Sequence, residues 1–237
     1  MNKKKNNFVA IIQARTDSSR LPKKVLAKIG DKTLIQFLIE RVALCEAIDQ
    51  IILATTTDHS DNELSNLVES LGIKVIRGSR EDVLSRYCKV AEIIDSKNYI
   101  RITGDCPLID PKLISETINY FLNSTFDYVS NAYPPTFADG LDVEVFSRDV
   151  LIKANLLSKT KHEREHVTPW IRNNKSLKIG CLKNNFDFSE SRWTVDEKED
   201  LELIRKIITN FKYQNNFSWQ EVLDFEKNNP EIFEKNK

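Results

Sequence analysis

A short stretch near the amino terminus, residues 14–24, gathers side chains that suit an anion. It reads Ala-Arg-Thr-Asp-Ser-Ser-Arg-Leu-Pro-Lys-Lys and so holds four cations and three hydroxyls. Arginine can clasp phosphate oxygens in bidentate fashion and lysine adds a point charge, so a nucleoside triphosphate suits this segment. Because the stretch has no glycine, side chains rather than a glycine-rich backbone cradle would have to hold the phosphates. Charge alone favours the simpler interpretation of a solvated loop.

Two aspartates are candidate ligands for a divalent cation. Asp105 follows an apolar run at residues 99–102, and Asp196 follows the segment 192–195. Mg²⁺ prefers oxygen ligands and commonly pairs one or two carboxylates with phosphate oxygens. Each residue also has a structural interpretation, because Asp105 can form a turn or a cap and Asp196 can be the N-cap of the helix that follows. The residues alone leave both interpretations open.

Two further polar clusters carry weaker signals. The first, residues 77–79, reads Arg-Gly-Ser and can form a base-recognition loop or a plain turn. The second, residues 163–166, reads Glu-Arg-Glu-His. Apart from His162, no second histidine or carboxylate stands at the usual zinc spacing there, so we expect no zinc site.

Strand-like and helix-like segments alternate along the first half of the chain. Apolar, β-branched runs lie at residues 8–13, 50–55, 74–76 and 99–102, and amphipathic stretches at residues 34–45, 62–71, 83–94 and from 111 onward. This alternation predicts a mainly parallel sheet with helices on both faces, in a single domain over residues 1–237. Ligands of such sheets bind beyond the carboxyl ends of the strands, so the cation-rich loop and Asp105 should lie together. Ser60 with Glu63 predicts a capping box for the second helix, and Gly72 should end it.

The rhythm changes in the middle of the chain, where residues 126–182 are interpreted as an inserted section. We predict a strand at residues 143–146, helices at 148–157 and 163–173, and returning strands at 178–182 and 193–195. A last amphipathic helix is expected at residues 197–208, and residues 228–237 are interpreted as a polar end.

Composition excludes several classes of protein. Lysine plus arginine equals aspartate plus glutamate at 35 each, so no overall basic excess favours nucleic-acid binding. The longest apolar runs are strand-length, far below the ~20 residues of a membrane helix. Four dispersed cysteines and no signal peptide predict a reduced cytoplasmic protein, with residues 1–7 as a solvated leader.

Taken together, the motifs resemble the spore-coat polysaccharide (SpsF-type) cytidylyltransferases, which are similar to the enzymes that activate sialic acids and 3-deoxy-manno-octulosonate as CMP-sugars. The resemblance spans roughly residues 8–208 and rests on residues 11–15, 18–22, 24–26, 77–78, 101–108, 139–145, 164–169 and 192–196. It implies a three-layer nucleotide-diphospho-sugar transferase-like fold, CTP and a sugar as substrates, Mg²⁺ as cofactor and a homodimer. Two positions depart from the family pattern: Lys23 stands where these loops often have glycine, and Asp17 where a small or apolar residue is common.

The resemblance also implies three sets of site residues. Nucleotide contacts are expected from Arg15, Ser18, Arg20, Lys24, Arg77, Arg86, Thr103 and Asp105, with the first four on the phosphates and the arginines 77 and 86 near the base or ribose. Mg²⁺ is expected on Asp105 and Asp196, and catalysis on Arg15, Lys24 and Asp105. Sugar contacts from the inserted section are expected from Asp139, Asp142, Glu144, Arg164, Glu165 and His166. The alternative for this last set is a subunit interface with buried ion pairs.

The reaction implied is attack by a sugar hydroxyl on the α-phosphorus of CTP, giving a CMP-sugar for surface polysaccharide or glycoconjugate synthesis and releasing pyrophosphate. One alternative is a glycosyltransferase that uses a nucleotide-sugar already made, although Asp105 supplies only one carboxylate of the acidic pair such enzymes need. The other is a noncatalytic nucleotide- or sugar-binding regulator, since a fold does not guarantee turnover. The sequence does not name the sugar.

Overall fold

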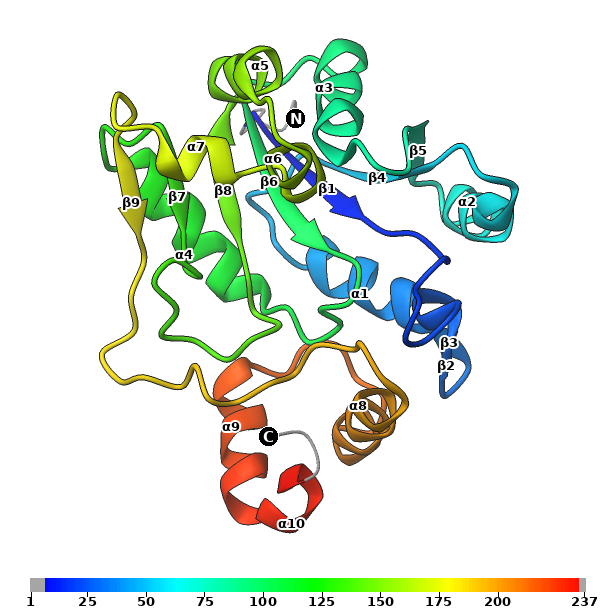
Figure 1. Cartoon of the computed structure of the whole chain (residues 1–237). Coiled ribbons are helices and arrows are strands. Elements are labelled where there is room, and N and C mark those ends of the chain that lie inside the picture. Colours follow the sequence, from blue (N-terminus) through cyan, green and yellow to red (C-terminus); the bar gives the residue numbers. More distant parts are fainter. Residues whose placement is uncertain (1–6, 235–237) are drawn as a thin grey trace, which may run out of the picture.

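A computed structural model describes residues 7–234, so residues 1–6 of the predicted leader lie outside it. Its centre is a seven-stranded sheet with the order β5-β4-β1-β6-β8-β7-β9 (Figure 1). The strands are β1 (Phe8–Gln13), β4 (Gln50–Thr56), β5 (Lys74–Gly78), β6 (Asn98–Thr103), β7 (Tyr128–Ser130), β8 (Glu144–Ser147) and β9 (Ile179–Cys181). The four strands from β5 to β6 are parallel, whereas β8 is antiparallel to both its neighbours and β7 is parallel to β9. The predicted mainly parallel α/β fold is confirmed.

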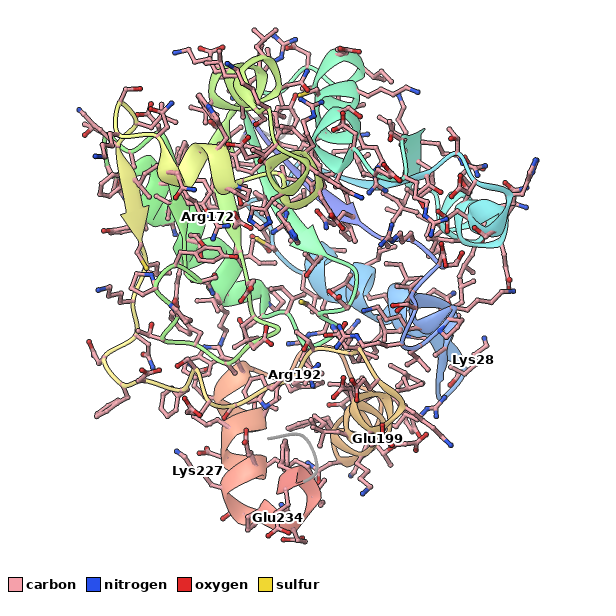
Figure 2. All side chains as sticks on the ribbon, in the orientation of Figure 1. Lys28, Arg172, Arg192, Glu199, Lys227 and Glu234 are labelled. Carbon is pink, nitrogen blue, oxygen red and sulfur yellow. The ribbon has the colours of Figure 1, made fainter. Side chains whose placement is uncertain are left out.

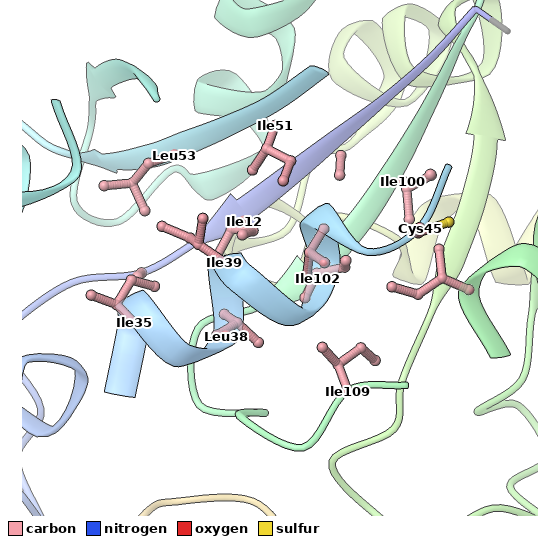
Figure 3. Close-up of a cluster of buried hydrophobic side chains, with 14 of the residues drawn as sticks. Ile12, Ile35, Leu38, Ile39, Cys45, Ile51, Leu53, Ile100, Ile102 and Ile109 are labelled. Atoms are coloured by element: carbon pink, nitrogen blue, oxygen red, sulfur yellow. The ribbon is translucent and has the colours of Figure 1, made fainter. Parts of the chain in front are cut away.

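Helices cover both faces of this sheet. They are α1 (Leu34–Ala43), α2 (Asn62–Ser70), α3 (Val83–Ile93), α4 (Pro111–Leu122), α5 (Arg148–Leu157), α6 (Lys161–His166), α7 (Pro169–Asn173), α8 (Lys198–Asn210), α9 (Trp219–Asn228) and α10 (Pro230–Phe233). One face packs against α1, α2 and α4, and the other against α3, α5 and α7. Figure 3 shows the first of these cores, where Ile35 and Leu38 of α1 pack with Ile12 and Ile102 of the sheet.

Strand β1 lies inside the sheet, between β4 and β6, and is buried on both faces. Phe8, Ala10 and Ile12 belong to the core on the α1 side, and Val9 and Ile11 to the core on the α3 side. Parallel strands covered by helices on both faces need a continuous apolar run, which is what this segment of the sequence supplies.

The ends of β1 and β6 lie side by side, and this fixes where the two predicted loops begin. Gln13 pairs with Thr103 in the parallel ladder, and the Gly104 N–H donates to the Gln13 carbonyl at 2.8 Å. A Cβ on Gly104 would come within 2.6 Å of the Cβ of Ala14. Glycine therefore lets the chain after β6 pass close to the chain after β1, so the cation-rich loop and Asp105 emerge together.

Residues 126–182, the section predicted to be inserted, contribute strands to the same sheet. The strands predicted at residues 143–146 and 178–182 are confirmed as β8 and β9, and the helix predicted at residues 148–157 is confirmed as α5. Gly72 follows the last residues of α2 with a φ of 77°, as its predicted role requires. Within residues 7–234, no helix has the length and apolar character needed to cross a bilayer.

A third group of helices, α8, α9 and α10, lies beside the carboxyl ends of β1 and β6 (Figure 1). In its core, Ile207 of α8 and Trp219 of α9 cluster with Trp193. The sequence predicted α8 but neither α9 nor α10. The polar interpretation of residues 228–237 is wrong for Phe233, which is buried in this core.

The strand predicted at residues 193–195 is wrong. Within the described chain this segment joins no ladder, and the isolated bridge between Asp139 and Arg192 lies just before it. The Val195 N–H instead donates to the carbonyl of Asp105 at 2.9 Å. Since the chain it runs beside is a loop, no second strand is there to extend a ladder.

Candidate active site

A cavity of about 300 Å³ opens beyond the carboxyl ends of β1 and β6. This is the edge at which open α/β sheets bind ligands. Ten of the predicted site residues line it, namely Arg15, Ser18, Arg20, Lys24, Arg86, Thr103, Asp105, Glu165, His166 and Asp196. The remaining five, Arg77, Asp139, Asp142, Glu144 and Arg164, lie outside its lining.

A buried aspartate that the sequence did not single out anchors the cation-rich loop. Asp61 accepts hydrogen bonds from the N–H and the hydroxyl of Thr16, both at 2.7 Å, and from the hydroxyls of Thr55 and Thr56 at the end of β4. Burial raises the pKa of Asp61, but these hydrogen bonds outweigh it and hold the pKa below its ordinary value. The capping box predicted at Ser60 is therefore wrong, because α2 begins after Asp61 and this carboxylate is committed to the loop.

Both departures from the family pattern have partners. Lys23 has a φ of 58°, in the left-handed region that glycine adopts most easily, and its N–H donates to the Thr16 carbonyl at 2.7 Å. Its ammonium lies 2.7 Å from Glu63 on α2. Asp17 forms an ion pair with Arg80. The loop thus keeps the turn that a glycine would give, and ion pairs join it to α2 and to the loop after β5.

The ammonium of Lys24 joins the two aspartates that were predicted to bind Mg²⁺. Its Nζ donates to Asp105 Oδ2 at 3.0 Å, to Asp196 Oδ1 at 2.9 Å and to the Val195 carbonyl at 2.7 Å. Burial lowers the pKa of Lys24, but the two carboxylates more than offset this, so its pKa lies above the ordinary value. A charged lysine therefore bridges the loop after β1, the loop after β6 and the segment before α8.

Three cations hold Asp196. Besides the lysine, Arg20 lies 2.9 Å from Oδ1 and Arg192 lies 3.1 Å from Oδ2. Figure 2 labels Arg192 close to α8, where it also pairs with Asp200 at 2.5 Å. The alternative of an N-cap at Asp196 is wrong, because the N-cap is Glu197. Burial by itself would raise the pKa of Asp196, but the three cations lower it by more. The pKa therefore lies below its ordinary value, and the group is held as a carboxylate.

Arg86 places a buried guanidinium at the cavity wall. The residue is 3% exposed, its Nη1 donates to the Ala54 carbonyl at 3.3 Å, and its Nε has no partner among residues 7–234. Burial and the neighbouring Arg15 lower its pKa. A buried donor without an acceptor is costly, so this position suits an oxygen from a ligand. Arg77, by contrast, donates to the Thr56 carbonyl at 2.7 Å and fixes the turn after β4.

Helix α6 brings Glu165 and His166 to the cavity. It ends there because Val167 takes φ 70° and ψ −56°, and the Thr168 N–H donates to the His166 carbonyl at 2.8 Å, which forms a γ-turn. A β-branched residue rarely adopts this strained conformation, and such strain clusters at functional sites. The single helix predicted at residues 163–173 is accordingly wrong and is divided into α6 and α7.

Arg164 is engaged within the scaffold. It donates twice to Asp82 Oδ2, at 3.0 and 2.5 Å, and once to the Asn155 carbonyl at 2.8 Å, which ties α6 to the start of α3 and to α5.

The rings of His162 and His166 have centroids 4.5 Å apart. In the described part of the chain, no cluster of three or more histidine, cysteine, aspartate or glutamate residues could hold a metal ion.

Three acids predicted to contact a sugar lie along one segment but in different surroundings. Glu144 is buried in β8, where it pairs with Arg101 and accepts a hydrogen bond from the Tyr128 hydroxyl at 2.6 Å. Asp139 lies 3.8 Å from Arg192, and burial raises its pKa. Glu144 therefore supports the sheet through an ion pair within the chain, whereas Asp139 borders the segment before α8.

The side chain of Asn131 holds the main chain on both sides of Asp142. The side-chain amide of Asn131 donates to the Leu141 carbonyl at 2.8 Å, and its oxygen accepts from the Val143 N–H at 2.7 Å, so both neighbours of Asp142 are fixed. Burial, assisted by nearby carboxylates, raises the pKa of Asp142 to about 7. This acid can therefore exchange a proton near neutral pH.

Comparison with known proteins decides the family. The family described as Cytidylyltransferase matches residues 9–232. This chain belongs to the cytidylyltransferase family. It is therefore a nucleotidyltransferase, and the resemblance inferred from its motifs is confirmed.

Two relatives and one solved structure show how far the likeness to this cytidylyltransferase extends. An uncharacterized protein of Methanocaldococcus jannaschii is 39% identical over 228 residues, covering 95% of this chain and 92% of the relative. The spore coat polysaccharide biosynthesis protein SpsF of Bacillus subtilis is 32% identical over 234 residues, covering 95% and 96%. A solved cytidylyltransferase from Leptospira borgpetersenii has a TM-score of 0.91 at 32% identity, covering 95% and 96%. The likeness thus includes residues 126–182 and the C-terminal helices.

The site of this cytidylyltransferase also depends on residues to which the sequence analysis gave no role of their own. Asp61 shapes the cation-rich loop, Arg192 holds Asp196, and the turn at Val167 directs α6. Asp61 lies where a helix begins, so its pattern is that of an ordinary cap. The partners of Arg192 become visible only once the segment before α8 is folded.

Proposed function

We propose that this cytidylyltransferase transfers CMP from CTP to a hydroxyl of a sugar, giving a CMP-sugar and pyrophosphate for the synthesis of a surface polysaccharide or glycoconjugate. The observation that carries the proposal is the bridge formed by Lys24 between Asp105 and Asp196. It joins the loop suited to phosphates to a pair of acids suited to a metal, at the edge of the sheet where ligands bind. The family membership supplies CTP, and the relative SpsF supplies the link to polysaccharide synthesis.

The cavity suits a triphosphate because its cations come from several elements. Arg15, Arg20 and Lys24 come from the loop after β1, and Arg86 from α3. We assign the first three, with Ser18, to the phosphates. Arg86 is assigned to the base or ribose because its unpartnered Nε needs an acceptor oxygen.

The residues present also fit Mg²⁺. Carboxylate oxygens of Asp105 and Asp196 lie within hydrogen-bonding distance of one ammonium, so two hard oxygen ligands converge on a position that a cation already occupies. Mg²⁺ is commonly held by one or two carboxylates, with substrate phosphates and water supplying its other ligands. Bound there, the ion would offset the charge of the phosphates and help to orient the α-phosphate.

The chain's own residues then supply positioning and charge. Arg15 and Lys24 would hold the phosphates and stabilise the negative charge that develops as the sugar hydroxyl attacks the α-phosphorus and pyrophosphate leaves. Glu165 and His166 line the cavity, and Asp139 and Asp142, although outside its lining, lie close enough to Asp105 for their charges to interact, so we assign these four residues to the sugar. Thr103 lines the cavity and completes the nucleotide side. We further propose that the enzyme works in the cytoplasm as a homodimer.

Pyrophosphate release tests the proposal. The protein is incubated with each nucleoside triphosphate, Mg²⁺ and a panel of nonulosonic, octulosonic and amino sugars, and pyrophosphate is measured. CTP with at least one sugar should give release, and EDTA should stop it. Absence of release with every combination would sink the proposal, and release from a nucleotide-sugar instead would favour a glycosyltransferase.

Asp105→Asn tests the metal assignment. Turnover should fall by about 10²-fold or more while the fold is kept, because a metal ligand is lost without emptying the core. Asp31→Asn, in the exposed hairpin of β2 (Lys28–Ile29) and β3 (Lys32–Thr33), is the matched control and should keep wild-type turnover. Wild-type activity in Asp105→Asn would contradict the assignment.

A further inference from the structure

We propose that Lys24 closes the metal site of the nucleotide-free enzyme, and that the two aspartates become available to a divalent cation only when a triphosphate draws the ammonium away. This rests on the proposed function, because it takes Asp105 and Asp196 as the metal ligands. It concerns the state of the enzyme before CTP binds.

The first support is the complete use of the lysine's donors. An ammonium has three N–H donors, and those of Lys24 go to Asp105, Asp196 and the Val195 carbonyl at 3.0, 2.9 and 2.7 Å. To bind a phosphate oxygen, Lys24 has to release one of these acceptors. The phosphate-binding arrangement and the closed arrangement therefore compete for the same three protons.

The second support is that the ammonium lies where a metal would need to lie. It is within hydrogen-bonding distance of a carboxylate oxygen from each aspartate, and its side chain is only 11% exposed. A dication placed between Asp105 and Asp196 would meet this buried positive charge at close range, where repulsion is strong. Metal alone therefore has to displace Lys24, whereas metal together with a triphosphate gives the lysine a new anionic partner.

The third support is that the aspartates keep their places without the lysine. The Val195 N–H donates to the Asp105 carbonyl at 2.9 Å, which joins the two acid-bearing segments through the backbone. Arg192 holds Asp196 through its other oxygen, Oδ2, at 3.1 Å. Removing the ammonium should leave two carboxylates in position but without their shared cation.

The consequence is a coupling between nucleotide and metal that passes chiefly through Lys24, with a second path through Arg20, which is also assigned to the phosphates and lies 2.9 Å from Asp196 Oδ1. A triphosphate that engages Lys24 raises the affinity for metal, and by linkage the metal raises the affinity for the triphosphate by the same factor. Without nucleotide, Asp105 and Asp196 stay paired with protein cations.

Binding of Mn²⁺ to the full chain without nucleotide, followed by electron paramagnetic resonance of the free ion, tests this directly. Lys24→Met removes the charge and keeps the length of the side chain, and it should bind Mn²⁺ at least about tenfold more tightly than the wild type. The matched control is Lys23→Met in the same loop, which removes the same charge from a lysine paired with Glu63 and should leave the Mn²⁺ affinity at the wild-type value. Asp105→Asn combined with Lys24→Met should abolish the gain.

Unchanged or weaker binding of Mn²⁺ by Lys24→Met, with a wild-type circular dichroism spectrum, would overturn the proposal, and so would an equal gain in Lys23→Met. If Lys24→Met does not fold, Lys24→Ala is measured against the same expectation. The CTP complex separates this inference from the proposed function. If Asp105→Asn weakens Mn²⁺ binding to that complex while Lys24→Met shows no gain without nucleotide, the metal assignment stands and the closed site is refuted. If Asp105→Asn has no effect there, both fail.

Discussion

Replacing Asp142 by asparagine should make the protein more stable at alkaline pH and remove part of its pH dependence. Burial and, to a smaller extent, the carboxylates of Asp139 and Glu144 raise the pKa of Asp142 from 3.8 to about 7, while Arg101 opposes them. Below about pH 4 the group is protonated in both the folded and the unfolded chain, so it costs nothing. As the pH rises toward 7 the unfolded chain loses this proton while the folded chain keeps it, and stability falls.

The shift sets the size of the effect. About three pKa units at 1.36 kcal/mol each correspond to a loss of up to about 4 kcal/mol between pH 4 and 8. Asparagine has nearly the same shape and does not ionise, so Asp142→Asn should avoid this loss. We expect the variant to exceed the wild type by about 2–4 kcal/mol at pH 8 and to approach it near pH 4. The other acids are present in both proteins, so their titrations largely cancel in the difference.

Urea unfolding followed by circular dichroism at several pH values between 4 and 8, with EDTA present, measures this difference. Asp149→Asn changes an exposed acid in the first turn of α5 and serves as the control, whose stability should run parallel to that of the wild type. If the curve of Asp142→Asn also runs parallel to the wild type over the whole range, the half-buried, proton-holding state assigned to Asp142 is refuted.

Two further substitutions test the scaffold of the site. Arg41 is fully buried and donates to four main-chain carbonyls, so Arg41→Met should lower the free energy of unfolding by about 3 kcal/mol or more. The control is Arg205→Met on the outer face of α8, where the partly exposed side chain donates to one carbonyl and to Glu202, so the loss should be clearly smaller. Equal losses in urea unfolding would contradict this. Gly104→Ala would place a Cβ 2.6 Å from the Cβ of Ala14, so we expect a stability loss of about 1–3 kcal/mol together with weaker CTP binding in calorimetry. The control is Gly72→Ala, whose Cβ meets no atom within 4 Å and carries only backbone strain, so it should destabilise the chain without weakening CTP binding. Unchanged CTP affinity in Gly104→Ala would contradict the argument that Gly104 is needed for the close approach to Ala14.

Hydrophobic pattern was enough to predict the part of the fold that is built from local repeats. The run at residues 8–13 and the helix at residues 148–157 have the bounds that the sequence indicated, because each buries a regular apolar face. Helix α9 was missed although the sequence carries its signal, because its buried residues Trp219, Val222 and Leu223 have the i, i+3, i+4 spacing of one helix face. Ser218 and Glu221 also form a capping box at its start. What the sequence could not show is its packing partner Trp193, which lies in a segment with no secondary structure of its own.

Long-range polar contacts explain why the site could be predicted only in part. The rule that ligands bind at the carboxyl ends of parallel strands correctly brought the cation-rich loop and Asp105 together. It could not show that Asp61 would turn away from its helix to hold Thr16, since that bond joins residues 45 positions apart. Local cap statistics favoured a capping box between Ser60 and Glu63, but in the structure α2 begins after Asp61 and has no such box.

The bridge that Lys24 forms to Asp105 and Asp196 also depends on contacts between residues far apart in sequence, so the sequence alone could not predict it. In the sequence, Lys24 belonged with Arg15 and Arg20 as a group free to receive an anion, and Asp105 and Asp196 as acids free to receive a metal. In the folded chain, Lys24 satisfies both acids across 81 and 172 positions of sequence. Lys24 and Arg20 balance the charges of the two acids before any substrate arrives, because buried charges without partners would destabilise the fold. The residues that would bind triphosphate and metal are therefore also those that hold the two halves of the site together, and a variant that removes one of them must be judged by metal binding and stability as well as by turnover.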